Sequence, residues 1–108
     1  LRGIPCGRLI LGGVKFLANQ GIKAGQMIPV KYNGRYVYYL VVRKTPYNNA
    51  TSADFQNALN ALVAHVDTYL VPKVIFANEI PQGLDRPTFE NIIKTTMGER
   101  LWDFYGPI

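Results

Sequence analysis

An acid and two bases lie where apolar segments of this sequence end. Arg43 and Lys44 follow the apolar run "YVYYLVV", and Asp85 follows "PQGL" just before an amphipathic segment. Gly83 would let a ligand approach the backbone closely, and a helix start directly after it would offer free N–H groups to an anion. A base and an acid on either side of such a loop would suit a phosphorylated ligand. The alternative is a solvated strand end and an acid that offsets a helix dipole.

Other side chains are weaker candidates for chemistry. His65 has no second histidine and Cys6 no second cysteine, so the sequence predicts no metal site, no intrachain disulfide and no cofactor. Glu79 and Asp85 would form a catalytic carboxylate pair only at a separation that the sequence does not fix. The tyrosines of "RYVYYL" could stack exposed RNA bases, but the apolar continuation favours a core strand.

The composition is that of a globular protein with a basic surface. The 108 residues carry a net charge of +5, with a pI of about 9.5. This charge favours anionic partners such as phosphates, nucleotides or nucleic acid, and it is also common in small domains without such partners. The single cysteine favours a reducing, intracellular location, cytoplasmic or nuclear. No apolar run approaches the roughly 18 residues of a membrane span, so we expect no membrane partner.

The length predicts a single domain over residues 1–108. The chain begins with Leu1 rather than Met, so a removed leader and a fragment of a longer chain are both alternatives. No internal repeat, low-complexity segment or linker interrupts it.

The clearest local pattern is a β-hairpin. Asn33 and Gly34 suit the two positive-φ positions of a type I′ turn, and apolar runs over residues 26–32 and 35–43 flank them. Pro29 cannot donate to a ladder, which favours an edge position or a bulge. The second run has almost no polar interruption, and we expect it to be buried on both faces.

The remaining elements are predicted by periodicity and caps. We expect helices over about 12–20, 52–70 and 88–97, with Thr51 or Ser52 capping the second, and strands over 73–78 and 101–106. This order predicts an α/β sandwich with a mixed sheet. The predicted core is Phe16, Val30, Tyr38, Leu40, Val42, Phe55, Leu59, Leu62, Val66, Val74, Phe76, Phe89, Ile92 and Ile93.

Residues 12–92 resemble a known family. "GGVKFLANQ", "NGRYVYYLVVRK" and "GLDRPTFENI" occur in this order in macrodomains, and the resemblance is closest to the branch that includes the terminal ADP-ribose protein glycohydrolase. It implies a three-layer α/β/α fold that binds ADP-ribose at the strand ends, with a Gly-rich loop around the diphosphate. The implied ligand-binding residues are Ile80, Pro81, Gln82, Gly83, Leu84, Asp85 and Arg43.

The resemblance also implies a chemistry that this sequence only partly carries. In the hydrolase branch, a lysine after the "YYL" strand attacks the ribose, and the aspartate of "GLD" is its acid/base partner. Asp85 matches that aspartate, but Arg43 occupies the lysine position and, being always protonated, cannot form a Schiff base. Lys44 should point to the opposite face. Pro81 occupies the position of a glycine in the family's phosphate-binding loop. "LRGIPCGRL" stands where the family has a second Gly-rich loop. The N-terminal strand and loop that carry the family's adenine-binding acid have no counterpart in this sequence.

We therefore expect a degenerate macrodomain-like module. It would bind ADP-ribose, an ADP-ribosylated protein or a related nucleotide weakly, or would have lost the ligand. The alternative is a non-enzymatic subunit that contacts RNA or protein in a larger assembly. A third reading is an active ADP-ribosyl hydrolase with Asp85 as a catalytic residue.

Overall fold

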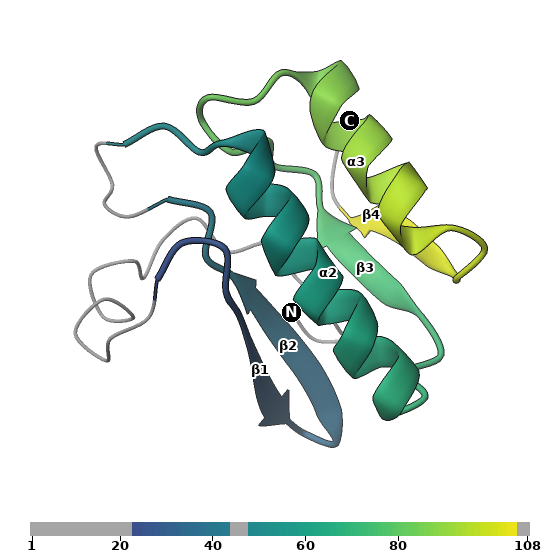
Figure 1. Ribbon diagram of the computed structural model, residues 1–108. Helices are drawn as coiled ribbons and strands as arrows, with labels where there is room; N and C mark the ends of the chain where they lie inside the picture. Colours follow the sequence, from purple (N-terminus) through teal and green to yellow (C-terminus); the bar gives the residue numbers. More distant parts are fainter. Residues whose placement is uncertain (1–22, 44–47, 106–108) are drawn as a thin grey trace.

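The computed structural model describes residues 23–43 and 48–105 (Figure 1). Its elements follow in the order β1 (Met27–Tyr32), β2 (Arg35–Leu40), α2 (Ser52–Thr68), β3 (Val74–Ala77), α3 (Arg86–Met97) and β4 (Trp102–Tyr105). The α/β class is confirmed, and so is each element expected between residues 26 and 105. The predicted helix at residues 12–20, with Phe16, lies outside the described residues, as do Cys6 and Lys44.

The hairpin forms at the predicted turn. Asn33 and Gly34 have φ values of 51° and 77°, the two positive values that a type I′ turn requires. β1 and β2 pair antiparallel, with Pro29 opposite Tyr38. β2 is shorter than predicted and ends at Leu40, although the N–H of Val41 still donates to the Gln26 carbonyl at 2.9 Å.

β2 is more buried on the face of Tyr38 and Leu40 than on the other, although Tyr36 on the first face is half-buried. Tyr38 and Leu40 are at most 1% exposed, whereas Val37 and Tyr39 are half-buried. The expectation of burial on both faces is therefore wrong for the described part of the chain. The prediction of Val30 as a core residue is also wrong. Val30 pairs with Val37 on the face away from Tyr38, and it is 40% exposed.

α2 begins and ends where its sequence indicates. The Thr51 hydroxyl accepts a hydrogen bond from the Asp54 N–H at 3.1 Å, which caps the helix start. The helix ends at Thr68, before Pro72, which cannot continue a helical hydrogen-bond pattern. Its buried stripe consists of Phe55, Ala58, Leu59, Leu62 and Val66.

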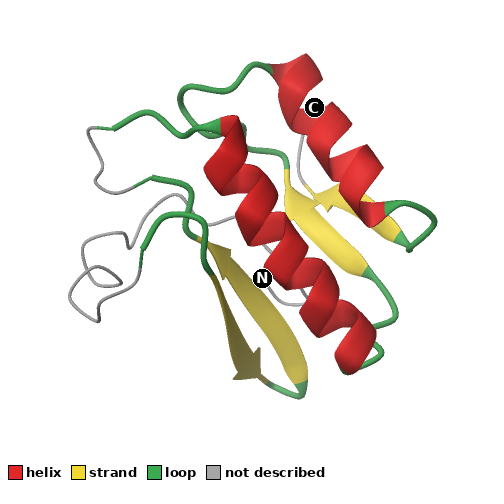
Figure 2. Ribbon diagram, in the orientation of Figure 1, coloured by secondary structure: helices red, strands yellow, loops and turns green. Residues whose placement is uncertain are grey.

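The second strand pair is parallel. β3 pairs with β4, with Val74 opposite Trp102, and this ladder is separate from the hairpin ladder in the described part of the chain. Figure 2 shows α2 and α3 side by side on one side of the strands. The rings of Phe55 and Phe89 stack between the two helices at 5.3 Å. Apart from Val30, every core residue predicted within the described ranges is buried.

His65 has a structural position on α2. Its Nδ1 and the hydroxyl of the buried Tyr38 are hydrogen bonded at 2.8 Å, and its ring contacts those of Tyr36 and Tyr69 at 4.6 and 4.4 Å. Burial lowers the pKa of His65. The Tyr36–Tyr38 side of β2 therefore packs against α2, with Tyr38 buried and Tyr36 half-buried, and base stacking by these tyrosines stays a prediction.

Candidate functional site

The connection from β3 to α3, residues 78–85, is an exposed turn held by apolar anchors. Pro81 is fully buried, and Ile80 and Leu84 pack against the core. The N–H of Leu84 donates to the Pro81 carbonyl at 3.1 Å, which places Gln82 and Gly83 at the centre of a β-turn. Both central residues are exposed. The predicted ligand-binding residues thus separate into buried anchors and an exposed tip.

A second chain segment crosses this turn at Gly83. The N–H of Ala50 donates to the Gln82 carbonyl at 2.7 Å. Gly83 has a φ of 107°, and a Cβ there would lie 2.7 Å from both the Ala50 oxygen and the Asn49 Cβ. Such distances exclude any side chain at this position unless the backbone moves. Gly83 is therefore required by the crossing of two segments, independently of any ligand.

The crossing brings together the segments that follow two different strands. Asn49 and Ala50 lie after β2, and Gln82 and Gly83 lie after β3. Figure 1 shows that the chain leaves both strands toward the side of the molecule where α2 and α3 begin. In the described residues no ladder joins β2 to β3, yet the two loops are in contact.

Asp85 is the N-cap of α3. Its carboxylate accepts a hydrogen bond from the Thr88 N–H at 2.8 Å. Hydrogen bonds from the side chain and backbone of Thr88 hold the pKa of Asp85 below its ordinary value. The carboxylate is therefore ionised at neutral pH and engaged in helix capping. A depressed pKa suits a base or a structural cap better than a proton donor.

Arg43 directly follows the buried pair Val41 and Val42. Its side chain is half-buried at the end of β2 from which the chain continues toward Asn49. Arg43 lies three residues after the last residue of β2, and its role as a ligand contact stays a prediction. Lys44, the alternative base, is outside the described residues.

The tip of the turn has two backbone donors for which the described residues supply no acceptor. No acceptor within residues 23–43 and 48–105 is hydrogen bonded to the N–H groups of Gln82 or Gly83. Leu84 and the N-cap Asp85 separate these groups from α3, and they lie at the end of the helix whose dipole attracts anions. Across the same described ranges, no three His, Cys, Asp or Glu side chains gather as a metal site would require.

Sequence reasoning missed Arg86. Its Nη1 and Nη2 atoms each lie 3.3 Å from Oδ1 of Asn78, and Nη1 also donates to Oε2 of Glu90 at 3.1 Å. The spacing of four residues between Arg86 and Glu90 could have indicated the helical ion pair. No local pattern indicates the contact with Asn78.

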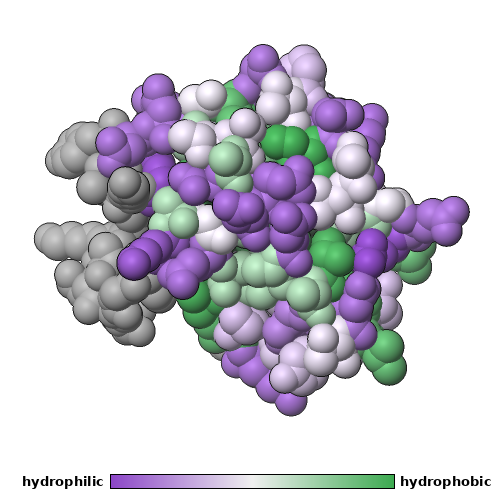
Figure 3. All heavy atoms as spheres, viewed as in Figure 1, coloured by the Kyte–Doolittle hydropathy of each residue, from purple (hydrophilic) through white to green (hydrophobic). Residues whose placement is uncertain are grey.

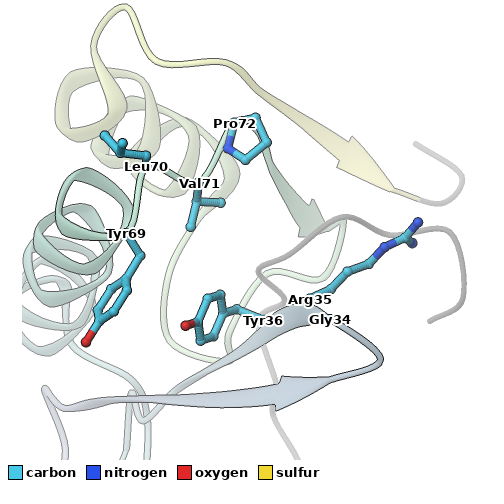
Figure 4. A pocket seen from close by; sticks show the side chains of 7 residues that line it. All are labelled: Gly34, Arg35, Tyr36, Tyr69, Leu70, Val71 and Pro72. Carbon is cyan, nitrogen blue, oxygen red and sulfur yellow. The ribbon is translucent and has the colours of Figure 1, made fainter.

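A cavity of about 300 Å³ lies at the other end of the fold, between the hairpin turn and the α2–β3 connection. In Figure 4 the rings of Tyr36 and Tyr69 line it, and Arg35 extends away from them. The neighbouring Leu70 is 84% exposed. None of the predicted ADP-ribose-binding residues lines this cavity, but Tyr36 is one of the tyrosines considered for base stacking.

The visible face of α2 and α3 is mainly hydrophilic. In Figure 3 strongly hydrophobic residues show only in small areas of it. Within the ranges that the structure describes, no helix is long and apolar enough to span a bilayer.

Comparisons with known proteins show relatives in sequence and in structure. No family model matches the sequence. It is 36% and 35% identical over 81 residues to ADP-ribose glycohydrolase OARD1 of Homo sapiens and Bos taurus, alignments that include 75% of this chain and 53% of each relative. The chain thus spans about half the length of the curated relatives it matches.

Solved structures of two macrodomains superpose well on this chain. The macrodomain of Mycobacterium tuberculosis DarG matches with a TM-score of 0.79 at 13% identity, over 100% of this chain and 93% of the other. That of Thermus aquaticus DarG matches with a TM-score of 0.74 at 13% identity, over 96% and 90%. The chain therefore has the macrodomain fold that its motifs predicted, and its sequence is related to those of the OARD1 glycohydrolases.

Proposed function

We propose that this chain binds ADP-ribose, or a closely related nucleotide, through the loop at residues 78–85. The observation that carries the proposal is the exposed Gln82–Gly83 turn ahead of α3, whose N–H groups have no acceptor in the described part of the chain. Such groups bind phosphate oxygens well. The relationship to the OARD1 glycohydrolases makes ADP-ribose the nucleotide to test.

The positive charge of the chain favours an anionic ligand, whereas two features of the loop limit the affinity for it. The net charge of +5 favours association with a diphosphate, and Arg43 at the end of β2 is the proposed side-chain partner for it. Two features weaken the site: Pro81 supplies no N–H, and the ionised Asp85 is close to the turn. We therefore expect binding in the micromolar range or weaker.

Binding is better supported than hydrolysis. Arg43 stands where the resemblance implies a nucleophilic lysine, and a guanidinium remains protonated under all physiological conditions. Asp85, the implied acid/base residue, already accepts the N–H of Thr88 as a helix cap. A hydrolase would need this carboxylate to serve both the helix and the substrate.

The test is a calorimetric titration of the folded chain with ADP-ribose, combined with NMR of its backbone amides. We expect saturable binding and shifts of the Gln82 and Gly83 amide signals. A folded chain that gives neither heat nor amide shifts would contradict the proposal. That result would favour the alternative of a non-enzymatic subunit that contacts RNA or protein.

Two arginine variants provide a matched control. Arg43→Ala and Arg100→Ala lower the net charge equally, but Arg100 is paired with Asp67 at 2.7 Å, beyond the far end of α3. We expect Arg43→Ala to weaken ADP-ribose binding and Arg100→Ala to leave it within twofold. A substitution at Gly83 is unsuitable as a blocked-loop control, because it would disturb the crossing with Ala50.

Turnover is tested separately with a mono-ADP-ribosylated protein as substrate. We expect no release of ADP-ribose above the rate without protein. Release that disappears in Asp85→Asn would instead support the hydrolase alternative.

A further inference from the structure

The side chain of Arg86 joins the two ends of the loop at residues 78–85. Arg86 is the first residue of α3, and Asn78 is the first residue after β3. Both terminal nitrogens of the guanidinium lie 3.3 Å from the same Asn78 oxygen. The chain leaves β3 and enters α3 at these two points, so the contact spans the base of the loop.

Glu90 holds the other side of this guanidinium. Its Oε2 accepts from Nη1 of Arg86 at 3.1 Å, one helical turn further along α3. Because Arg86 and Glu90 are 41% and 31% exposed, the ion pair is solvated, and such pairs add little to folding stability. A planar guanidinium with two fixed acceptors nevertheless has a defined orientation.

Three further contacts fix the rest of the loop. Pro81 is buried in the core, Leu84 closes the turn onto it, and the Gln82 carbonyl accepts from Ala50. The contact between Arg86 and Asn78 is the side-chain link between the loop's entry and its exit.

We infer that Arg86 is a positioning residue for a diphosphate-bearing nucleotide. Through Asn78 it holds the end of β3 and the start of α3 at the separation that aims both turn N–H groups at one anionic group. This inference rests on the proposed function. Direct phosphate binding by Arg86 is less consistent with the geometry, because both terminal nitrogens already donate to protein oxygens and Glu90 offsets the charge.

The first experiment is a double-mutant cycle in ADP-ribose affinity. We expect Arg86→Ala and Asn78→Ala each to weaken binding about tenfold, and the double variant to be no weaker than either single one, because they remove the same link. Arg100→Ala, with the same loss of charge, should bind as the wild type does. Additive losses in the double variant, or wild-type binding by Arg86→Ala, would overturn the inference.

Two readouts separate positioning from a charge contact. Arg86→Lys keeps the charge but loses the two-nitrogen fork, so we expect it to remain weaker than the wild type. The salt dependence of affinity should be the same in Arg86→Ala and the wild type, since no phosphate contact is lost. Full rescue by lysine, or a reduced salt slope in Arg86→Ala, would assign Arg86 to the ligand instead.

Amide hydrogen exchange in the ligand-free chain tests the inference even if ADP-ribose does not bind. We expect Arg86→Ala, but not Arg100→Ala, to change the exchange rates and chemical shifts of Gln82 and Gly83. A wild type that does not bind, together with these changes, would refute the proposed function and leave the positioning role standing. Unchanged loop amides in Arg86→Ala would refute the positioning role itself.

Discussion

The two described helices begin on the same side of the molecule and are capped in the same way. At α2, the Thr51 hydroxyl accepts the N–H of Asp54 at 3.1 Å, and at α3 the Asp85 carboxylate accepts that of Thr88 at 2.8 Å. One cap is neutral and the other is ionised. The shared geometry shows that capping alone explains an oxygen-bearing side chain at both positions. Only the negative charge of Asp85 is not explained by capping, since the neutral Thr51 caps α2 without one.

The backbone in front of the two helices differs more than the caps do. Before α2, the N–H of Ala50 is used by the Gln82 carbonyl. Before α3, the N–H groups of Gln82 and Gly83 have no acceptor in the described part of the chain. The residue directly before the N-cap uses its N–H in both cases, Ala50 toward Gln82 and Leu84 toward Pro81. The two helix starts differ in the turn ahead of α3, whose Gln82 and Gly83 N–H groups are the ones that the proposed function assigns to a ligand.

The largest expected effect comes from breaking the crossing between these two helix starts. In Gly83→Ala, a Cβ would lie 2.7 Å from the Ala50 oxygen, at a φ of 107°. We expect a loss of about 3 kcal/mol in the free energy of unfolding, measured with urea. Gly34→Ala is the matched control, since its φ is 77° but no atom lies within 4 Å. It should cost about 1 kcal/mol, and equal losses would show that the crossing adds no constraint.

The next effect is the loss of each cap. Thr51→Ala should cost about 1 kcal/mol of stability, because one N–H at the start of α2 loses its acceptor. Asp85→Ala should lower the melting temperature further at neutral pH, because its charge also interacts with the helix dipole. Asp85→Thr should recover most of this loss. If Asp85→Thr recovers none of the loss, the stability that Asp85 contributes comes from its charge and not from the capping hydrogen bond.

Acid should weaken one cap and leave the other intact. Because the folded-state pKa of Asp85 is depressed, its contribution is fully present above the ordinary value of 3.8 and is lost as the pH falls through the lower folded value. Thr51 has no charge to lose. In that window the protection of the Thr88 amide against hydrogen exchange should fall relative to that of Asp54. Asp85→Thr should abolish the difference, and a parallel fall of both amides in the wild type would contradict this account.

The smallest effect on stability is expected from loss of the ion pair beyond the C-terminal end of α3. Arg100 and Asp67 form an exposed ion pair at 2.7 Å. Arg100 lowers the pKa of Asp67, and Asp67 raises the pKa of Arg100. Solvent and salt screen such pairs strongly. Arg100→Ala should therefore lower the melting temperature less than Thr51→Ala does, with the difference from the wild type shrinking in high salt. A loss that persists in high salt would indicate packing by the Arg100 stem instead.

Local signals in the sequence predicted the described elements, although β2 ends three residues before its predicted end. Asn33-Gly34 predicted the hairpin because two consecutive positive φ values leave few other residue choices. The apolar spacing and Thr51 predicted α2 with its cap. Val30 was misplaced because its own residue type favours burial, whereas its exposure depends on which face of the hairpin α2 covers.

The sequence did not predict the contacts that join different segments of the chain at the candidate site. The sequence predicted the turn at Gly83 and the acid at the helix start, and both are there. It did not predict that Gly83 lies against Ala50, or that Arg86 contacts Asn78. Those contacts depend on how the segments are brought together by packing of α2, α3 and the strands, which no local pattern encodes.

In evolutionary terms, the crossing makes Gly83 a residue that selection retains for the fold. A descendant that had lost its ligand would still need glycine there, because the Asn49–Ala50 backbone leaves no room for a side chain. Gln82 is under no such constraint, since its side chain is exposed and its carbonyl is supplied by any residue type. The proposed ligand contact at position 82 is also a backbone N–H, which any residue except proline supplies, so neither position would record the loss of a ligand through its side chain.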